Sequence, residues 1–278
     1  MQAGEVSNRP DDIGKRNDSM GLPYKNASNI ANQLSPGVWG RVPLRNCLAL
    51  TDGCGWLKTD LNLPMSGTGV VDVLGGGDIL IAGASATDKV TAAEFGTEIQ
   101  LTAAGHIVLG GMNPSIDLGS RRNWACEISL ANATAVNHGM FFGLASFADS
   151  GATVVTAGNV LHATTSALAT QSSIVGFYKD EGAATVEAMM KKDEVVDGSQ
   201  VVHKAAASTM GAGTFHKWGM CGDGSNLRYF VDGVQVGADL DLGDSDLPAE
   251  SDLICVLAVT SSAASDFIIR YMAFAESN

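Results

Sequence analysis

Two acidic side chains stand on predicted strands of this 278-residue chain: Glu127 in the segment WACEISLA and Glu187 in the segment VEAMMK. Two carboxyl groups facing each other, roughly 5–5.5 Å apart, can hydrolyse a glycosidic bond with retention of configuration. Here each carboxylate is single among apolar or neutral neighbours. We therefore expect solvent-facing strand residues and no enzymatic activity, with a glycoside hydrolase that uses an unrecognised acid pair as an alternative.

An acidic run, DLDLGDSD, could supply oxygen ligands for calcium. It lacks the Asp-x-Asp-x-Asp-Gly order of an EF-hand loop, and Glu250 is misplaced for the closing ligand. A solvated turn, or the wet face of a strand, explains the run equally well. No cofactor is expected, and the weak calcium candidates are Asp239, Asp241, Asp244 and Asp246.

The histidines and cysteines do not form a metal-binding pattern. None of the five histidines has a His or Cys partner at the spacing that a zinc site uses. The five cysteines are odd in number and include no Cys-x-x-Cys, and residues 1–20 do not resemble a signal peptide. We expect reduced thiols in a protein made in the cytoplasm. The cysteines are Cys47, Cys54, Cys126, Cys221 and Cys255.

The net charge of −13 argues against nucleic acid or an anionic membrane as a partner. Residues 1–64 carry seven Lys or Arg against six Asp or Glu, a net charge of +1, whereas residues 65–278 carry −14. No apolar run approaches the ~18 residues that a bilayer-spanning helix needs. The chain is therefore expected to be soluble, with its acidity concentrated after residue 64.

Short β-branched and aromatic runs, separated by Gly, Asp, Asn and Ser, indicate an all-β fold. The clearest example is FHKWGMCGDGSNLRYFVDGVQVG, residues 215–237, which reads as three strands joined by tight turns. Asp232-Gly233 between two β-branched runs predicts a hairpin with a type I′ turn. Further strands are expected at residues 70–74, 78–82, 98–102, 106–109, 124–131, 139–146, 174–179, 186–191, 195–204, 253–260 and 267–276.

Residues 215–237, together with WACEISL, FFGL and the closing IIRYMAFAE, resemble the concanavalin A-like (laminin G-like) jelly rolls. The resemblance covers about residues 105–278 and implies a two-sheet antiparallel sandwich. The glucanases of this family place their acids as Glu-x-Asp-x-x-Glu on one strand, and that motif does not occur here. We accordingly predict a jelly-roll domain over residues 65–278.

Residues 1–64 are predicted to form an extended arm in front of the sandwich. Five of the seven prolines fall in this range, which disfavours long helices and central strands. A short helix over residues 26–34, ended by Ser35-Pro36, is expected. Apolar side chains in the arm must be buried on the chain's own sandwich or on a partner, and as partner-binding anchors we predict Tyr24, Leu34, Trp39, Leu44, Trp56 and Leu61.

A non-enzymatic sandwich with a long N-terminal arm resembles virion proteins of tailed bacteriophages. This resemblance implies a decoration, or cement, protein on the capsid surface, assembled in the host cytoplasm. Its partners would be the major capsid protein and neighbouring copies of itself, arranged as a homotrimer. The alternative is a carbohydrate-binding module of a phage fibre or another surface assembly, with a glycan as its partner.

Overall fold

The structure, a computed structural model, describes residues 34–40, 47–52, 63–64, 67–73, 77–83, 89–93, 96–101, 105–111, 116–120, 122–134, 136–146, 160–161, 168, 173–192, 201–248 and 253–277. In these ranges the helical elements are the four-residue α2 (Pro36–Trp39) and the 3-10 turn η3 (Leu118–Ser120). None of the described helices is long and apolar enough to cross a membrane. The prediction of an all-β chain is confirmed.

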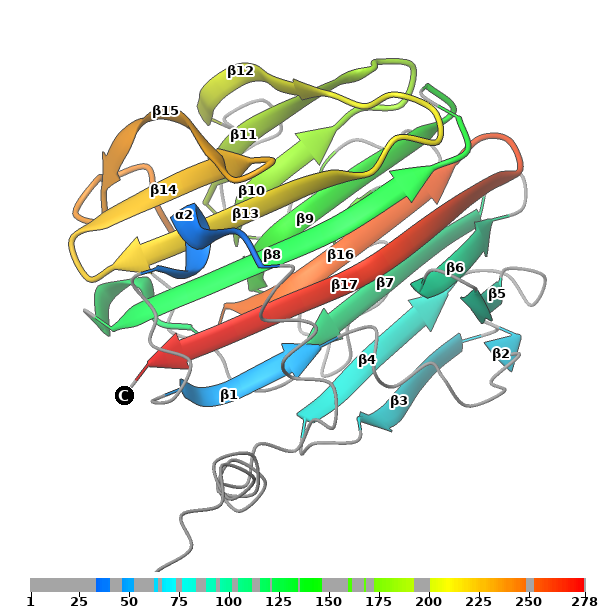
Figure 1. Cartoon of the computed structure of the whole chain (residues 1–278), viewed down its shortest axis with the longest axis horizontal. Coiled ribbons are helices and arrows are strands. Elements are labelled where there is room, and N and C mark those ends of the chain that lie inside the picture. Colours follow the sequence, from blue (N-terminus) through cyan, green and yellow to red (C-terminus); the bar gives the residue numbers. More distant parts are fainter. Residues whose placement is uncertain are drawn as a thin grey trace, which may run out of the picture.

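The strands form two antiparallel sheets that pack face to face as a jelly-roll sandwich (Figure 1). Sheet A has the order β15 (Val234–Asp241), β14 (Asn226–Val231), β13 (His216–Asp223), β8 (Asn123–Asn132), β17 (Ser265–Ser277), β6 (Gly96–Leu101), β5 (Lys89–Ala93) and β2 (Leu63–Pro64), and β1 (Cys47–Asp52) pairs with the end of β17. Sheet B has the order β12 (Val201–Thr209), β11 (Thr185–Lys191), β10 (Ser173–Lys179), β9 (His138–Ser146), β16 (Ile254–Ser261), β7 (Gly105–Gly111), β4 (Gly77–Gly83) and β3 (Gly67–Val73).

The main core lies between the two sheets and follows from strand alternation. On β8, Trp124, Cys126 and Ile128 point into this core, and Ala125 and Glu127 point to the outer face. Both faces of β8 are nevertheless buried, as are both faces of β9. Successive strand residues point to opposite sides, so the outer faces of both sheets must be covered by other parts of the chain.

The predicted hairpin is present. Asp232 and Gly233 have φ angles of 51° and 80°, the two positive values that a type I′ turn requires, and they join β14 to β15. The other predicted strands also occur, with ends shifted by a few residues except at β12, which begins six residues later than expected. Short strands β1, β2 and β5 were not predicted.

Strands β1 and β2 fall inside the range predicted to be an arm, so the sandwich includes part of residues 1–64. β1 extends sheet A along the last residues of β17, where Leu50 lies opposite Ala275. β2 contains Pro64 at the end of the sheet order, where a missing backbone N–H is tolerated. Residues 47–52 and 63–64 thus belong to the sheet despite the high proline content of this range.

A second segment covers the outer face of sheet B. Val160, Leu161 and Leu168 are buried there against Phe141 and Tyr178, in a cluster separate from the main core. The sequence predicts a surface loop at residues 150–173. The three described residues of this loop instead help to bury the outer face of sheet B.

Candidate functional site

Residues 34–40, here called the docked segment, lie on the outer face of sheet A, where α2 crosses β8 and β13 (Figure 1). Ser35 is the N-cap of α2, and Pro36 occupies its first turn, where a fixed φ and a missing N–H suit a helix start. The sequence predicts that Ser35-Pro36 ends a helix over residues 26–34. In the structure this dipeptide begins one, and residues 26–33 lie outside the described ranges.

The docked segment is held by three apolar side chains. Leu34, Val38 and Trp39 are 7%, 0% and 6% exposed. Burial of such side chains stabilises the contact by roughly 1.5–3 kcal/mol each. On the sheet side, the cluster that receives them consists of Ala125, Cys221, Phe230, Tyr271 and Ala273.

Glycines allow the segment to approach the sheet closely. A β-carbon on Gly219 would lie 2.7 Å from Cγ2 of Val38, and a β-carbon on Gly37 would lie 2.8 Å from the carbonyl oxygen of Gly233. Both distances are shorter than real contacts of a β-carbon. Gly219 therefore forms the floor on which Val38 rests.

We expect Gly219→Ala to destabilise the protein by about 1–3 kcal/mol, because the added methyl group meets the stiff side chain of Val38. In a Val38→Ala background the same change should cost much less, since the next atom, the carbonyl oxygen of Cys126, is 3.4 Å away. Urea unfolding of the four proteins gives the coupling energy. An equal penalty in both backgrounds would show that Val38 does not rest on Gly219.

Beneath the docked segment lies a buried carboxylate. Glu127 is 0% exposed, and its two carboxylate oxygens each accept a hydrogen bond from the Ser35 backbone N–H at 3.2 Å. The Tyr271 hydroxyl donates a further hydrogen bond to Oε1. Burial raises the pKa of Glu127, although the hydrogen bonds from Tyr271 and Ser35 and the charge of Lys217 act in the opposite direction. The expectation of a solvent-facing Glu127 is wrong, because the docked segment covers it.

The second acidic candidate lies on the other side of the molecule. Glu187 is half-buried on β11, between Val186 and Ala188, which both point into the core from sheet B. Glu187 therefore points to the outer face of sheet B, and Glu127 to the outer face of sheet A. The whole thickness of the sandwich, two sheets packed roughly 10 Å apart, separates the two carboxylates. They therefore cannot flank one glycosidic bond.

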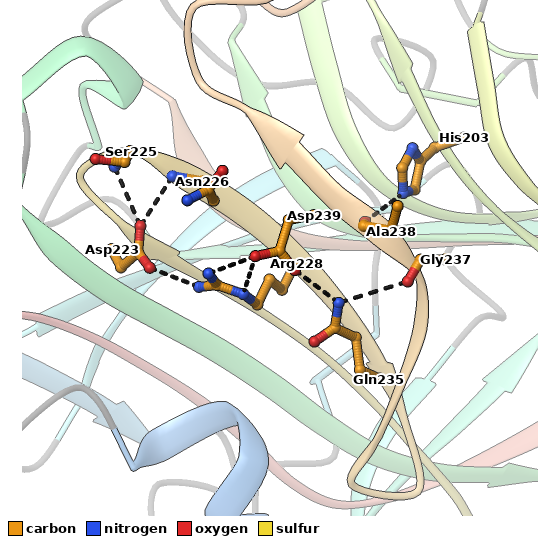
Figure 2. Close-up of polar contacts among 9 residues, drawn as sticks. All are labelled: His203, Asp223, Ser225, Asn226, Arg228, Gln235, Gly237, Ala238 and Asp239. Carbon is orange, nitrogen blue, oxygen red and sulfur yellow. Dashed lines mark hydrogen bonds and ion pairs between the residues drawn. The ribbon is translucent and has the colours of Figure 1, made fainter.

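An ionic network fastens the outer edge of sheet A (Figure 2). Arg228, on β14, donates to Asp223 at 2.6 Å and to Asp239 on β15 at 2.6 and 2.9 Å. Burial alone raises the pKa of Asp223, but hydrogen bonds from Arg228, Asn226 and Ser225 outweigh it and lower the pKa to about 2. These contacts hold three consecutive strands together.

Three of the four calcium candidates use their carboxylates in contacts within the chain. Asp239 binds Arg228 and also accepts a hydrogen bond from Gln235 at 2.8 Å (Figure 2). Asp241 and Asp244 accept hydrogen bonds from backbone N–H groups two residues ahead, as in solvated turns. In the described ranges, no group of three or more His, Cys, Asp or Glu residues is placed to hold a metal ion.

A polar cluster that was not predicted from the sequence is buried at one end of the core. Lys179, 0% exposed at the end of β10, donates to the carbonyl oxygen of His138 at 2.6 Å and to that of Asp180 at 3.2 Å. Burial lowers the pKa of Lys179 to about 8, against the opposing charges of Asp180 and Glu181. Burial, and then the charge of Lys179, lowers the pKa of His138 to about 3.

Two of the six predicted anchors lie in the described ranges. Leu34 and Trp39 pack on the chain's own sandwich, so for these residues the structure favours self-docking over the partner contact that we predicted. The other four anchors, Tyr24, Leu44, Trp56 and Leu61, lie outside the described residues.

No family model matches the sequence, and no curated protein matches it. Among solved structures, the chain is similar to the potassium-bound carbohydrate recognition domain of Emp46p, with 13% identity, a TM-score of 0.46, and coverage of 70% of this chain and 87% of that one. It is also similar to a Bacteroides ovatus GH16 protein solved with a glucan product, with 11% identity, a TM-score of 0.42, and coverage of 81% and 94%.

A third similar structure is a carbohydrate esterase from the Shiga toxin-encoding bacteriophage phi24B, with 14% identity, a TM-score of 0.39, and coverage of 71% of this chain and 90% of that one. At these identities the likeness concerns the fold alone.

Proposed function

We propose that the protein is a non-enzymatic structural protein of a bacteriophage virion, which decorates the capsid surface as a cement protein. The observation that carries the proposal is the docked segment, which covers the outer face of sheet A and encloses Glu127. Among the described residues, the two candidate carboxylates lie on opposite outer faces of the sandwich. A body with this arrangement is suited to holding a position in an assembly.

The docked segment divides the predicted arm into two parts with different roles. Residues 34–40 fix the chain to its own sandwich, so residues 1–33 start from a defined point on the outer face of sheet A. Under this proposal, residues 1–33 contact the major capsid protein and neighbouring copies in a trimer. The net charge of −14 on residues 65–278 keeps particles apart by charge repulsion.

Removing residues 1–33 is expected to abolish co-sedimentation with capsid shells prepared without the protein, while the melting temperature stays within a few degrees of the full chain. The deletion stops before Leu34, because a longer one would remove the docked segment and then β1. The matched variant is Trp39→Ala, which loosens the docked segment but keeps residues 1–33.

The two variants separate the two roles. If Trp39→Ala binds capsid shells and the deletion variant does not, attachment through residues 1–33 is supported. Loss of binding by Trp39→Ala together with binding by the deletion would transfer attachment to residues 34–40. A third outcome is that the unmodified chain and both variants do not bind capsid shells but bind specific glycans on an array. The protein would then be a carbohydrate-binding module, the alternative function that this fold admits.

A further inference from the structure

The docked segment occupies a groove that the sandwich forms without it. The groove lies across β14, β13, β8 and β17, four neighbouring strands whose ladders do not involve residues 34–40. Its floor is Gly219, and the side chains around the floor are Ala125, Cys221, Phe230, Tyr271 and Ala273. The groove therefore has the form of a binding site for a short peptide, and residues 34–40 show which peptide fits it.

Three contacts define the peptide that the groove accepts. The Ser35 backbone N–H donates to both carboxylate oxygens of Glu127 at 3.2 Å. A β-carbon on Gly37 would lie 2.8 Å from the carbonyl oxygen of Gly233, so this position requires a glycine. Val38 fills the space above the floor and is 0% exposed. The groove thus recognises a backbone N–H, a glycine and a valine in the order in which the sequence SPGV presents them.

The docked segment lies at the surface and holds its own shape. Its backbone hydrogen bonds run within residues 35–40, to the carbonyl oxygens of Ser35 and Pro36. Pro36, Gly37 and Gly40 are exposed, and Figure 1 shows α2 on the outside of sheet A. Among the described hydrogen bonds, the one from Ser35 to Glu127 joins the segment to the sheet. The segment can therefore leave the groove without breaking any strand pairing.

A second copy of the chain carries the peptide that fits. The sequence LSPGVW occurs once in the chain, at residues 34–39. Residues 41–46 link the docked segment to β1, and this link reaches at most about 25 Å when fully extended. A groove within this reach can take the segment of a neighbouring copy, while β1 of that neighbour stays paired with its own β17.

We propose that the groove also binds residues 34–40 of a second copy, so that neighbouring copies exchange their docked segments. Exchange preserves each contact between segment and groove, and it changes only the path of residues 41–46 and the entropy of association. A short tether holds the segment at an effective concentration on the order of 1 mM, so exchange increases as the protein concentration approaches this value. The inference goes beyond the proposed function, because it concerns free copies in solution and needs no capsid.

The test is a disulfide that joins two copies only when their segments are exchanged. A β-carbon on Gly233 would lie 3.4 Å from the β-carbon of Ser35, close to the separation of roughly 3.5–4.5 Å that a disulfide needs. Ser35→Cys and Gly233→Cys are prepared as two separate proteins, mixed in guanidinium chloride, refolded together and oxidised with glutathione disulfide. We expect a covalent dimer whose peptide map links position 35 of one protein to position 233 of the other.

The matched control is Gly182→Cys, mixed with Ser35→Cys in the same way. Gly182 has a φ of 86°, similar to the 80° of Gly233, and a β-carbon there would meet no atom within 4 Å. The Gly233→Cys mixture should give several-fold more dimer than this control, and its yield should increase with protein concentration. A yield equal to that of the control would overturn the proposal.

A second measurement avoids the strain that Gly233→Cys places on its turn. The unmodified chain, refolded at on the order of 1 mM, should show dimers or larger assemblies by size-exclusion chromatography with light scattering. Trp39→Ala weakens the segment in its own groove and in that of a neighbour, so this variant should remain a monomer. A chain that is monomeric at every concentration, or a Trp39→Ala variant that associates as fully as the unmodified chain, would contradict exchange.

Discussion

Replacing Gly143 with alanine is expected to destabilise the sandwich by more than about 3 kcal/mol and to prevent most of the chain from folding. Gly143 on β9 lies directly opposite Gly176 on β10. A β-carbon at position 143 would lie 2.2 Å from the carbonyl oxygen of Val175 and 2.6 Å from the α-carbon of Gly176. These are backbone atoms of the neighbouring strand, so no side-chain rotation relieves the clash.

The opposite glycine is equally constrained. A β-carbon on Gly176 would meet the carbonyl oxygen of Phe142 at 2.4 Å and the Phe141 ring at 2.9 Å. The Phe141 ring thus packs over the space that a side chain at position 176 would fill, as aromatic residues do over glycines in sheets. The two strands can separate only by breaking the ladder that joins β9 to β10 in sheet B.

Gly211→Ala is the matched control, because its β-carbon would meet only the Thr214 hydroxyl, at 3.3 Å. Thermal and urea unfolding of the three proteins, with the yield of soluble protein, measures the effect. Gly211→Ala should unfold close to the unmodified protein. A Gly143→Ala protein that also melts within 2 °C of it would refute the close approach of β9 and β10.

Strand positions were predictable from sequence because alternation and turn chemistry are local. Asp232-Gly233 specifies its turn through the φ angles that two adjacent residues must adopt. In contrast, β1 and β5 are only six and five residues long, CLALTD and KVTAA, and they contain no aromatic and at most two β-branched residues. Their pairing is set by β17 and β6, which come from other parts of the chain.

The environment of Glu127 could not be predicted from its neighbours in sequence. Its backbone hydrogen-bond donor, Ser35, is 92 residues away, and its hydroxyl donor, Tyr271, is 144 residues away. The segment WACEISLA gave the strand and the direction of the side chain. What covers that face depends on the N-terminal chain, where proline spacing predicted an extended arm and left open whether it packs on its own sandwich or on a partner.

Lys179 illustrates the same limit. A lysine at the end of a strand is normally exposed, and the sequence gives no reason to bury this one. The structure buries it because the end of β10 lies inside the sandwich, beside the carbonyl oxygen of His138. Its charge lies beside His138, the buried histidine at this end of the core.

Acidification is expected to destabilise the protein through His138, by on the order of 4 kcal/mol between pH 7 and pH 3. Its neutral ring accepts a hydrogen bond from Asn132 at Nδ1, at 2.8 Å, and directs Nε2 toward the sulfur of Met210 at 3.1 Å. The His138 ring also packs against the Phe267 ring in a T-shaped arrangement, with the two ring planes at 90°. A proton on Nδ1 would oppose the Asn132 donor and place a second positive charge beside Lys179.

The direction follows from proton binding in the two states. In the unfolded chain a histidine has a pKa near 6.5, whereas His138 in the folded protein has a pKa of about 3. Between these values the unfolded state binds more protons, so the stability contributed by a neutral His138 is complete above pH 6.5. This stability is lost as the pH falls toward 3.

Comparison with His138→Gln isolates this contribution from that of the carboxylates. The variant should be less stable at pH 7, because the contacts with Phe267 and Met210 are lost, but it should lose less stability on acidification. The difference between the two free energies of unfolding, measured with urea from pH 7 to pH 4, should therefore shrink as the pH falls. The difference in free energy of unfolding between His138→Gln and the unmodified protein could instead stay constant over this range. That result would mean that His138 accepts a proton in the folded protein without penalty, which requires the core to open at this end.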